Sequence, residues 1–481
     1  MHNIQREETY MKKNPLVLSL LCIGFLFLVS GCNSKAPGLS PEELPPIPEK
    51  LTPDWIGTAI IYEVNIRQYT EEGTFNAFSA HLDRLQALGI NTLWFMPIHP
   101  ISAEKRLGTL GSYYSIADYY GINPEFGNAD DFKALVDLSH EKGFKVMLDW
   151  VANHTGWDNL WITQHSDWYT QNRNGIILQA NGWSDVAQLN YRNTDLRLEM
   201  IKAMTYWVRE FDVDGFRCDY ASGVPANFWE TARNEISRYK KIYMLAEAEP
   251  VTSLLKSAFD SYYNWRLYQN ALLLIAKGTA KASSVRDYIP IARVPEGRFP
   301  LNFMDNHDEN SWRDTTAEIF GKDAIPAFTA LIFTLPGVPL VYSGHEAGLD
   351  KMLAFFEKDQ IPWTEFPYQE LITKLAGIKI TNPALHNGSA GGTFNSITTE
   401  NENIIAFESV KDNNKITVII NLSGEQQSET NNWGITSGGM ILLNGDAQTT
   451  VKTSASSLSS EELQGRLSAF SPWEYYVIST Q

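Results

Sequence analysis

The chain has 481 residues, 43% of them hydrophobic, which is enough for a large core and, at roughly 150 residues per domain, for about three structural units. Its 39 basic and 56 acidic residues give a net charge of −17, and no run of lysine and arginine interrupts this acidic balance. Because nucleic acid binding requires clustered cations that meet the phosphates, the composition argues against a nucleic acid partner.

The N-terminal segment has the pattern of an export signal. Lys12 and Lys13 precede an apolar run, Pro15 to Val29, that is too short for an ordinary membrane span. We therefore predict a signal peptide over residues 1–31. The run ends in Val29-Ser30-Gly31-Cys32, which resembles a bacterial lipobox. This predicts that Cys32 is lipidated and anchors an exported protein to the outer membrane, on its periplasmic or surface face. The alternative is a cleaved secretory signal in which Cys32 is incidental.

Residues 32–53 are rich in Pro and Glu, as an extended tether would be. From Ala59 onward, strand-like runs alternate with amphipathic stretches of helical period, which is the pattern of a parallel sheet covered by helices. Eight such units predict a (β/α)8 TIM barrel, an α/β fold, over residues 54–370. The predicted strands are Ile60–Ile66, Thr92–Pro97, Lys145–Asp149, Gly215–Asp219, Tyr243–Glu247, Phe259–Tyr263, Leu301–Met304 and Pro339–Tyr342.

Two stretches depart from this alternation. Residues 155–191 are rich in Trp, Asn, Asp and Gly and have little periodic pattern, so they predict a long insertion after the third strand. Long irregular segments inside compact domains tend to be functional. From residue 371 the pattern changes to short β-type runs with Asn/Gly/Ser-rich turns, which predicts a separate all-β domain, a β-sandwich, over residues 371–481.

Four polar clusters directly follow strand-like runs, so we expect them to lie together at the mouth of the barrel, where the chemistry of this fold is placed. Cleavage of a sugar acetal needs a proton for the leaving oxygen and stabilisation of an oxocarbenium-like centre, usually from a pair of carboxyl groups. The clusters supply such groups. They are D-W-V-A-N-H at Asp149–His154, G-F-R-C-D at Gly215–Asp219, L-A-E at Leu245–Glu247 and D-N-H-D at Asp305–Asp308.

The two carboxyl groups that end neighbouring strands have different surroundings. Asp219 is the expected nucleophile, because Arg217 lies two residues earlier on the same strand face and holds the carboxylate ionised. Glu247 is the expected acid, because its apolar approach over residues 243–246 raises its pKa. Glu249 has the same parity and is the alternative acid. A retaining pair of carboxyl groups would lie roughly 5–5.5 Å apart.

The remaining polar residues of the clusters have supporting roles in this hypothesis. Asp308 is a third carboxylate, His154 and His307 donate to sugar hydroxyls, and Asp149 and Asn153 bind Arg217 or shape the loop. A zinc site is the alternative for the same residues. However, neither histidine has a partner at ligand spacing, and no H-E-x-x-H or Cys/His cluster is present. Rossmann and Walker phosphate loops are absent from the sequence too, so we predict no nucleotide cofactor.

With these clusters in this order, the chain resembles the α-amylase family of glycoside hydrolases (family 13), most clearly from Trp55 to Glu365. The four clusters are similar to that family's four signature regions, and residues 114–119 look like its loop with a sugar-stacking tyrosine. The resemblance implies that residues 155–191 are the family's domain B, here short. It implies the following roles: Asp219 as nucleophile, Glu247 as acid/base, Asp308 as transition-state stabiliser, and Tyr114, His154, Arg217 and His307 as sugar contacts.

The sequence departs from the family pattern at two places. Many members bind a structural calcium ion through the first-region Asn, an Asp in a D-L-N-like stretch, and a His four residues after the nucleophile. Asn153 is present, but Gln188 and Gly223 stand at the other two positions, and neither supplies the anionic oxygen that calcium prefers. We therefore predict no cofactor; a structural calcium ion is the alternative, which Gln188 and Gly223 disfavour. The second departure concerns linkage: Tyr220 follows the nucleophile, unlike the Val or Thr of some family subgroups, and Val186 to Asn190 matches no linkage-diagnostic pattern well.

The resemblance and the intact carboxylates together predict a retaining α-glucan hydrolase. Its expected substrates are starch-like polysaccharides or maltooligosaccharides, cleaved most readily at α-1,4 bonds. A transglycosylase, or an α-glucosidase specific for α-1,6 or another linkage, would use the same three carboxylates and is the alternative. A non-catalytic glucan-binding lipoprotein is the alternative from another class, but such proteins typically lose one of these carboxylates.

Overall fold

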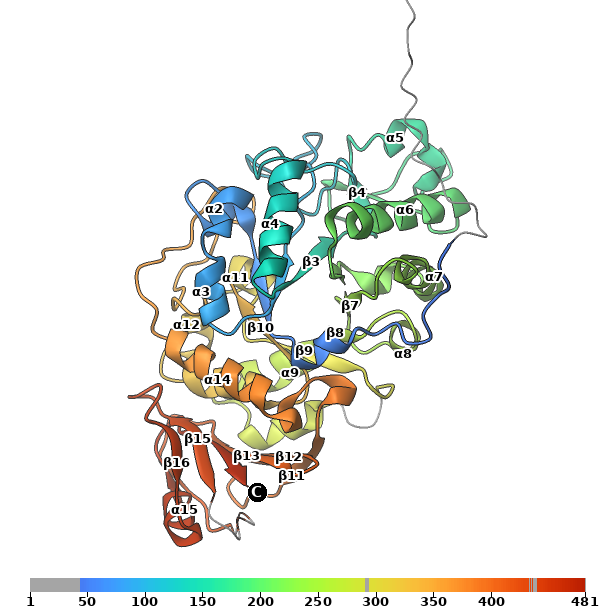
Figure 1. Ribbon diagram of the computed structural model, residues 1–481. Coiled ribbons are helices and arrows are strands. Elements are labelled where there is room, and N and C mark those ends of the chain that lie inside the picture. Colours follow the sequence, from blue (N-terminus) through green and yellow to red (C-terminus); the bar gives the residue numbers. More distant parts are fainter. Residues whose placement is uncertain (1–43, 290–293, 432, 434, 436–438, 481) are drawn as a thin grey trace, which may run out of the picture. The chain divides into compact units, whose positions relative to one another are not determined.

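The computed structural model describes residues 44–289, 294–431, 433, 435 and 439–480 (Figure 1). The predicted signal peptide, Cys32 and residues 32–43 of the predicted tether lie outside these residues. The chain divides into one unit of residues 1–44 and a second unit of residues 45–481, which contains all the helices and strands named below. Within the described ranges, no helix combines the length and the apolar character needed to cross a membrane.

Eight parallel strands close into a barrel in the order β1-β10-β9-β8-β7-β6-β3-β2. This confirms the predicted (β/α)8 barrel, and each predicted strand overlaps an observed one. Nearly every strand residue is buried, because helices cover the outside of the cylinder and side chains fill the inside. The strands are β1 (Ile61–Val64), β2 (Thr92–Phe95), β3 (Lys145–Trp150), β6 (Gly215–Cys218), β7 (Tyr243–Ala246), β8 (Ser261–Tyr263), β9 (Phe299–Asn302) and β10 (Val338–Tyr342).

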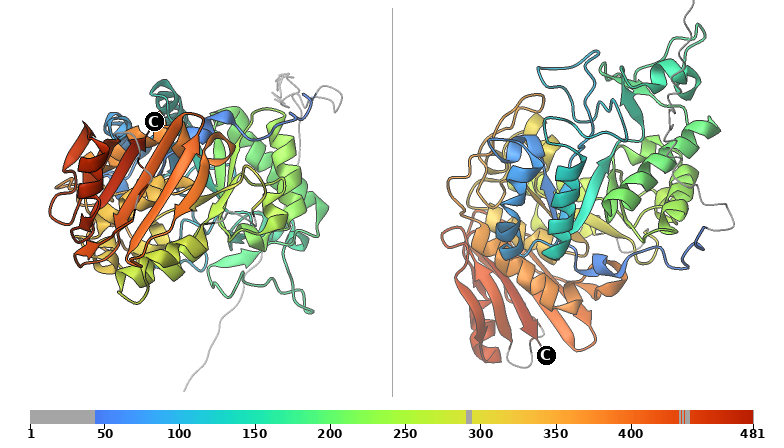
Figure 2. Two further views of the ribbon diagram at one scale, coloured as in Figure 1. Left: turned by 90° about the horizontal axis from the view of Figure 1, so that it is seen from below. Right: turned by 45° about the horizontal axis from the view of Figure 1, so that its top comes forward.

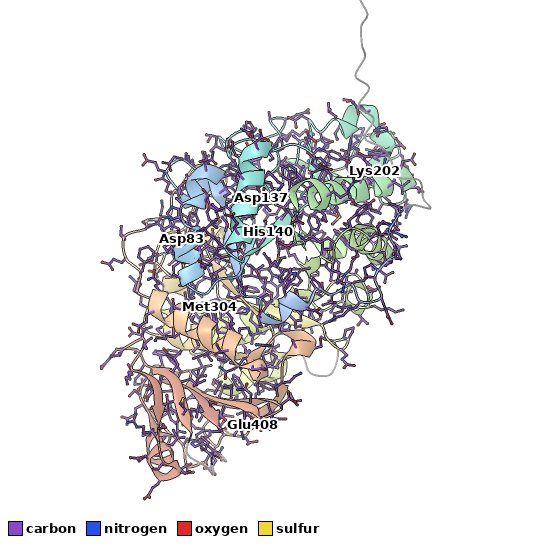
Figure 3. The ribbon with its side chains drawn as sticks, viewed as in Figure 1. Asp83, Asp137, His140, Lys202, Met304 and Glu408 are labelled. Carbon is purple, nitrogen blue, oxygen red and sulfur yellow. The ribbon has the colours of Figure 1, made fainter. Side chains whose placement is uncertain are left out.

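The longer helices α4, α6 and α7 bury one face and expose the other, whereas α13 is buried on every side. In α4, Asn128 accepts hydrogen bonds from the first-turn N–H groups, and Phe132, Leu135 and Val136 are buried toward the sheet. Exposed Asp137 lies on the opposite side (Figure 3). The helices are α1 (Ile66–Tyr69), α2 (Phe75–Ser79), α3 (Leu82–Ala87), α4 (Ala129–Glu141), α5 (Trp161–Gln164), α6 (Thr194–Phe211), α7 (Ala226–Ser237), α8 (Thr252–Leu255), α9 (Trp265–Leu267), α10 (Leu273–Ala276), α11 (His307–Trp312), α12 (Thr316–Phe320), α13 (Ile325–Thr334) and α14 (Gln369–Thr381).

The insertion after the third barrel strand is built on a short antiparallel pair, β4 (His154–Gly156) and β5 (Val186–Gln188). The register places His154 opposite Gln188. Isolated bridges such as Gln171 to Ile177 extend this pairing through the loop between the two strands. The insertion is therefore connected directly to the polar cluster that ends β3.

The C-terminal part contains a six-stranded antiparallel sheet in the order β11-β12-β13-β18-β15-β16 and a two-stranded ribbon, β14-β17 (Figure 2). One face of the large sheet joins the hydrophobic core of the barrel, and the other packs on α15 and the ribbon. The elements are β11 (Thr393–Ile397), β12 (Ile404–Lys411), β13 (Asn414–Asn421), β14 (Gln427–Ser428), β15 (Met440–Gly445), β16 (Thr453–Ser457), α15 (Ser460–Arg466), β17 (Ala469–Phe470) and β18 (Tyr475–Thr480).

Two details of this region differ from the sequence prediction. The predicted domain boundary at residue 371 falls inside α14, whose buried residues Leu371, Ile372 and Leu375 belong to the barrel core. The layer that covers the outer face of the large sheet is a helix with a two-stranded ribbon rather than a second full sheet. The barrel already covers the other face, so the small outer layer completes the burial of the sheet.

Candidate active site

The four polar clusters meet at the carboxyl ends of the barrel strands, around a pocket of about 340 Å³. Each follows from the local fold: Asp149 is in β3, Arg217 is in β6, Asp219 directly follows β6 and Glu247 directly follows β7. Six of the seven predicted catalytic and sugar-contacting residues line the pocket, and Arg217 lies fully buried beneath it. The six are Tyr114, His154, Asp219, Glu247, His307 and Asp308.

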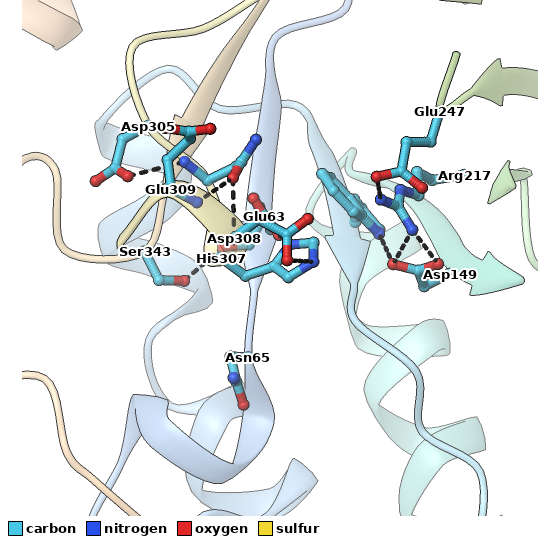
Figure 4. A network of polar contacts seen from close by, with 12 residues as sticks. Glu63, Asn65, Asp149, Arg217, Glu247, Asp305, His307, Asp308, Glu309 and Ser343 are labelled. Atoms are coloured by element: carbon cyan, nitrogen blue, oxygen red, sulfur yellow. Dashed lines mark hydrogen bonds and ion pairs between the residues drawn. The ribbon is translucent and has the colours of Figure 1, made fainter. Parts of the chain in front are cut away.

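Arg217 is the centre of the polar network (Figure 4). Its Nη1 donates to Asp149 Oδ1 and to Asp219 Oδ1, both at 3.0 Å, and its Nη2 lies 2.8 Å from Glu247 Oε1. Its Nε donates to the Tyr263 hydroxyl at 3.2 Å. The guanidinium therefore holds three carboxyl groups from three barrel strands in one place. The contact with Asp219 that the sequence predicted is present.

Asp149 anchors this network from below. It accepts hydrogen bonds from Trp94 Nε1 at 3.2 Å and from the Tyr114 hydroxyl at 3.0 Å, in addition to the bonds from Arg217. Burial raises the pKa of Asp149 to about 6, and Arg217 opposes this shift. With four donor contacts, Asp149 fixes the position of the guanidinium and thereby the positions of the two carboxyl groups above it.

Asp219 and Glu247 are both shifted in pKa, and burial is the main cause in each. Burial raises the pKa of Glu247 to about 7, and the negative charges of Asp219 and Asp308 add to the shift, whereas Arg217 opposes it. Burial raises the pKa of Asp219 to about 6, again against Arg217. Glu247 Oε2 also accepts a hydrogen bond from Tyr220 N at 2.7 Å. Glu247 therefore retains its proton to a higher pH than Asp219 does.

The two histidines of the pocket have opposite charge preferences. Burial lowers the pKa of His154 to about 3, so its ring is neutral. Burial also acts on His307, but the carboxylates of Asp308 and Glu63 outweigh it and raise the pKa of His307 to about 9. His307 Nε2 lies 2.8 Å from the Tyr114 hydroxyl and 3.5 Å from Asp308 Oδ1.

Sequence reasoning missed two parts of the site. Glu63 contacts His307 from β1, and its only signal was a carboxyl group inside an otherwise apolar strand, Ile61-Tyr62-Glu63-Val64. The aromatic walls were missed too. Trp183 packs edge-on against Tyr220 at one wall, with 5.7 Å between ring centroids, and Trp312 packs against Phe355 at another, with 5.3 Å. Trp183 and Trp312 are 43% and 58% exposed, so their rings are accessible to a ligand.

Glu249, the alternative acid, lies outside this arrangement. Its Oε2 is 3.2 Å from Arg266 Nε, and it is not among the residues that line the pocket. Glu247 is the carboxyl group after β7 that shares Arg217 with Asp219. The geometry thus selects Glu247 over Glu249 as the partner of Asp219.

The position expected for a family calcium ion is a poor fit for a cation. Gln188 Nε2 donates to Asn153 O at 2.9 Å, to Asn153 Oδ1 at 3.1 Å and to Leu189 O at 3.2 Å. A hydrogen-bond donor is thus directed at oxygens that a metal ion would need as ligands. A Cβ atom on Gly223 would lie 2.6 Å from Asn153 Oδ1 and 2.4 Å from the Tyr220 ring, so glycine is required for this packing. Across the described residues, no cluster of three His, Cys, Asp or Glu side chains has the geometry of a metal site.

Comparison with known proteins gives consistent matches. The sequence profile of the alpha amylase catalytic domain matches residues 62–426. A crystal structure of a noncanonic maltogenic alpha-amylase, AmyB, from Thermotoga neapolitana superposes with a TM-score of 0.75 at 30% identity, covering 88% of this chain and 97% of that one. A crystal structure of an alpha-amylase from Lactobacillus plantarum gives a TM-score of 0.77 at 28% identity, covering 89% and 99%.

Among curated relatives, alpha-amylase MalA of Haloarcula japonica is 25% identical over 395 residues, which is 78% of this chain. The chain spans 56% of the length of that relative.

Proposed function

This chain belongs to the alpha-amylase family, and from that membership we propose that it is a retaining glycoside hydrolase of starch-like α-glucans or maltooligosaccharides. The observation that carries the proposal is the shared ion pairing of Asp219 and Glu247 with Arg217, at the ends of adjacent strands. A retaining mechanism needs two carboxyl groups that reach the same glycosidic bond from close range. The 1,4 linkage is the expected preference, in keeping with the relatives named alpha-amylases.

In the proposed mechanism, Asp219 attacks the anomeric carbon while Glu247 donates its proton to the leaving oxygen. The covalent glycosyl-enzyme is then hydrolysed by a water molecule that Glu247, now a base, deprotonates. The pKa values support this division, because Asp219 is ionised at a pH at which Glu247 still retains part of its proton. Asp308 stabilises the positive charge of the transition state.

Sugar binding is assigned to the walls of the pocket. Tyr114 stacks on His307, with 5.4 Å between ring centroids and 22° between planes, and it lines the pocket. His154 and His307 donate to hydroxyl groups of the bound sugar, and Arg217 acts from beneath through the carboxylates. The exposed rings of Trp183 and Trp312 provide flat surfaces on which further sugar units stack.

Product analysis tests this proposal. Maltooligosaccharides incubated with the protein are expected to give glucose, maltose and other shortened products, with the α-anomer formed first by NMR. An Asp219→Ala variant is expected to lose turnover by at least about 10⁴-fold while remaining folded. Dominance of longer oligomers would instead indicate a transglycosylase. If the unmutated protein showed no turnover, and if Asp219→Ala bound the sugar as tightly as the unmutated protein does, the result would indicate a glucan-binding lipoprotein.

We also propose that the protein is exported and anchored to the outer membrane, on its periplasmic or surface face, through a lipid on Cys32. The support is the charged, apolar and lipobox-like order of residues 12–32. Metabolic labelling with palmitate is expected to label the protein, and a Cys32→Ser variant is expected to lose the label and leave the membrane fraction. A Cys32→Ser variant that stays in the membrane fraction would contradict this proposal.

A further inference from the structure

Glu63 is a fully buried carboxyl group in the middle of β1, between the apolar residues Tyr62 and Val64. A carboxylate inside a barrel is costly unless it is paired or hydrogen-bonded. Glu63 Oε1 is at hydrogen-bonding distance from His307 Nδ1, while Oε2 has no hydrogen-bond partner among the described residues. Figure 4 shows this contact beside Asp308, on the opposite side of the network from Arg217. The partner that offsets the burial of Glu63 is therefore His307.

The hydrogen bonds around His307 fix where its protons are. A carboxylate oxygen accepts hydrogen bonds, so we assign His307 Nδ1 as the donor in its contact with Glu63 Oε1. On the other side of the ring, the Tyr114 hydroxyl donates its one proton to Asp149 Oδ2 at 3.0 Å. The Tyr114 oxygen must therefore accept from His307 Nε2, which lies 2.8 Å away. Both ring nitrogens carry a proton, which is the definition of an imidazolium.

We propose that Glu63 is a positioning residue that keeps His307 doubly protonated, so that its Nε2–H remains a donor toward the pocket. In the unliganded site this N–H faces the Tyr114 oxygen and Asp308 Oδ1. When a sugar enters, the same N–H is a charged donor for a hydroxyl group beside Asp308. A bond from a charged donor is roughly twice as strong as a neutral one. The inference rests on the proposed function for its substrate, but the protonation of His307 is independent of it.

Other titratable and charged groups also act on Glu63 and His307. The charge of Glu63 also acts on Tyr342 of β10, Tyr263 of β8 and Asp305 after β9, and raises the pKa of each. Arg217, Asp149 and Asp308 act on His307 together with Tyr114. Glu63 and Asp308 raise the pKa of His307, whereas burial and Arg217 lower it. Among these groups, Glu63 makes the direct contact with Nδ1, and its charge can be removed without changing its shape.

A Glu63→Gln variant makes this test, because the amide oxygen still accepts from Nδ1–H while the negative charge is lost. The measurement is the imidazole ¹⁵N NMR signal of His307, assigned by its absence in His307→Gln. In the unmutated protein we expect an imidazolium up to about pH 9. In Glu63→Gln we expect titration at least ~1 pH unit lower. A neutral His307 at pH 7 in the unmutated protein, or the same titration in both proteins, would overturn the proposal.

Activity gives a second readout that a purely structural role would not produce. With a maltooligosaccharide, the ratio of kcat/KM in Glu63→Gln to kcat/KM in the unmutated protein at the same pH is expected to be several-fold lower at pH 8.5 than at pH 5.5, where His307 carries its proton in both proteins. An equal loss at both pH values contradicts the proposal. If the protein proves to have no hydrolase activity, the NMR titration still decides the role of Glu63, so the two failures are distinguishable.

The chain offers matched controls for both measurements. Glu346 is also fully buried in the barrel, where it accepts from the Tyr62 hydroxyl and pairs with Arg84. Glu346→Gln is expected to leave the His307 titration unchanged, even if it lowers the melting temperature. Glu63→Asp keeps the charge and is expected to retain the imidazolium. A shift of His307 in Glu346→Gln as large as that in Glu63→Gln would show a general effect of barrel damage and would count against the proposal.

Discussion

At the scale of single residues, Arg217 is the one on which the site depends. Its guanidinium is fully buried and contacts Asp149, Asp219 and Glu247. An isolated buried carboxylate is strongly unfavourable, and the loss of its cation is more costly than the loss of the whole pair. The same cation that keeps the site folded opposes the effect of burial on the pKa of each carboxyl group. Stability and the ionisation needed for catalysis therefore depend on the same side chain.

An Arg217→Met variant is expected to be destabilised by about 3–5 kcal/mol at pH 8. The deficit should shrink toward pH 5, and the sign follows from linkage. Loss of the cation raises the folded-state pKa values of Asp149, Asp219 and Glu247 further above their unfolded values, so the folded state takes up protons as the pH falls. Urea unfolding at both pH values measures this. An equal deficit at pH 5 and pH 8 would contradict it, and Arg217→Lys, which keeps the charge, should show a weaker pH dependence.

The pKa values of Asp219 and Glu247 predict the pH profile of the reaction. Activity should rise as Asp219 ionises near pH 6 and fall as Glu247 loses its proton near pH 7, which gives a narrow bell in kcat/KM. In Glu247→Gln the alkaline limb should disappear. This variant should still form the glycosyl-enzyme from α-maltosyl fluoride, whose leaving group needs no proton, and azide should restore its turnover. Loss of activity on the fluoride equal to that on maltooligosaccharides would contradict the assignment.

At the scale of elements, the sequence was informative wherever an apolar run ended in a polar residue. Asp219 and Glu247 were found because each directly follows four buried strand residues, and parallel strands end at the same side of a barrel. Glu63 was not found, because a single carboxyl residue in an apolar run looks the same in the sequence whether its side chain is buried and paired or exposed to solvent. Trp183 lies in the loop before β5 and Trp312 is the last residue of α11, so the two rings reach the pocket from elements that are far apart in sequence. Contacts of that kind depend on tertiary packing, which periodicity does not report.

Helix boundaries show the same limit. The stretch from Phe75 to Leu88 has one continuous helical periodicity in the sequence but forms two helices, α2 and α3. The interruption falls where the His81 ring packs edge-on against Tyr69, with 5.2 Å between ring centroids. The predicted domain boundary at residue 371 failed for a related reason. The buried residues of α14 recur with helical spacing and pack in the same hydrophobic core as the barrel residues. The first strand of the C-terminal sheet begins only at Thr393.

The β4–β5 insertion leads to a prediction about metal dependence. Gln188→Glu replaces the amide donor with a carboxylate, so that it converges with the Asn153 and Leu189 oxygens as calcium ligands do. Without calcium, the melting temperature of this variant should be lower than that of the unmutated protein, because the new carboxylate faces the negatively polarised oxygens of Asn153 and Leu189. At a calcium concentration 100-fold above its dissociation constant it should gain about 2.7 kcal/mol. Thermal melts with calcium and with chelator measure the difference.

The control for this experiment is Gln188→Met, which removes the donor and supplies no ligand. It should be destabilised equally with calcium and with chelator. The unmutated protein should also melt at the same temperature in both. If Gln188→Glu showed no response to calcium, the arrangement of the three oxygens would not be that of a latent cation site.

At the scale of the whole molecule, the barrel and the large C-terminal sheet share one hydrophobic core. Ile416, Val418 and Ile420 of β13 point into the cluster that contains the barrel residues, whereas Ile419 points into the second cluster under α15. Phe328 of α13 packs against Trp473, which precedes β18, with 5.9 Å between ring centroids. Because the core is continuous across this contact, the sheet should not unfold separately from the barrel.

A matched pair of substitutions on β13 tests this cooperativity. Ile419 and Ile420 are both fully buried and adjacent, but they face opposite clusters. Ile419→Ala and Ile420→Ala should each cost about 2–5 kcal/mol. If the molecule unfolds as one unit, both variants show a single thermal transition, and activity is lost at that transition in each. If instead Ile419→Ala melted in two steps, with activity surviving the first, the sheet would be an independent unit. The shared core predicts the first result, because every residue on the barrel-facing side of β13 loses its packing when the barrel opens.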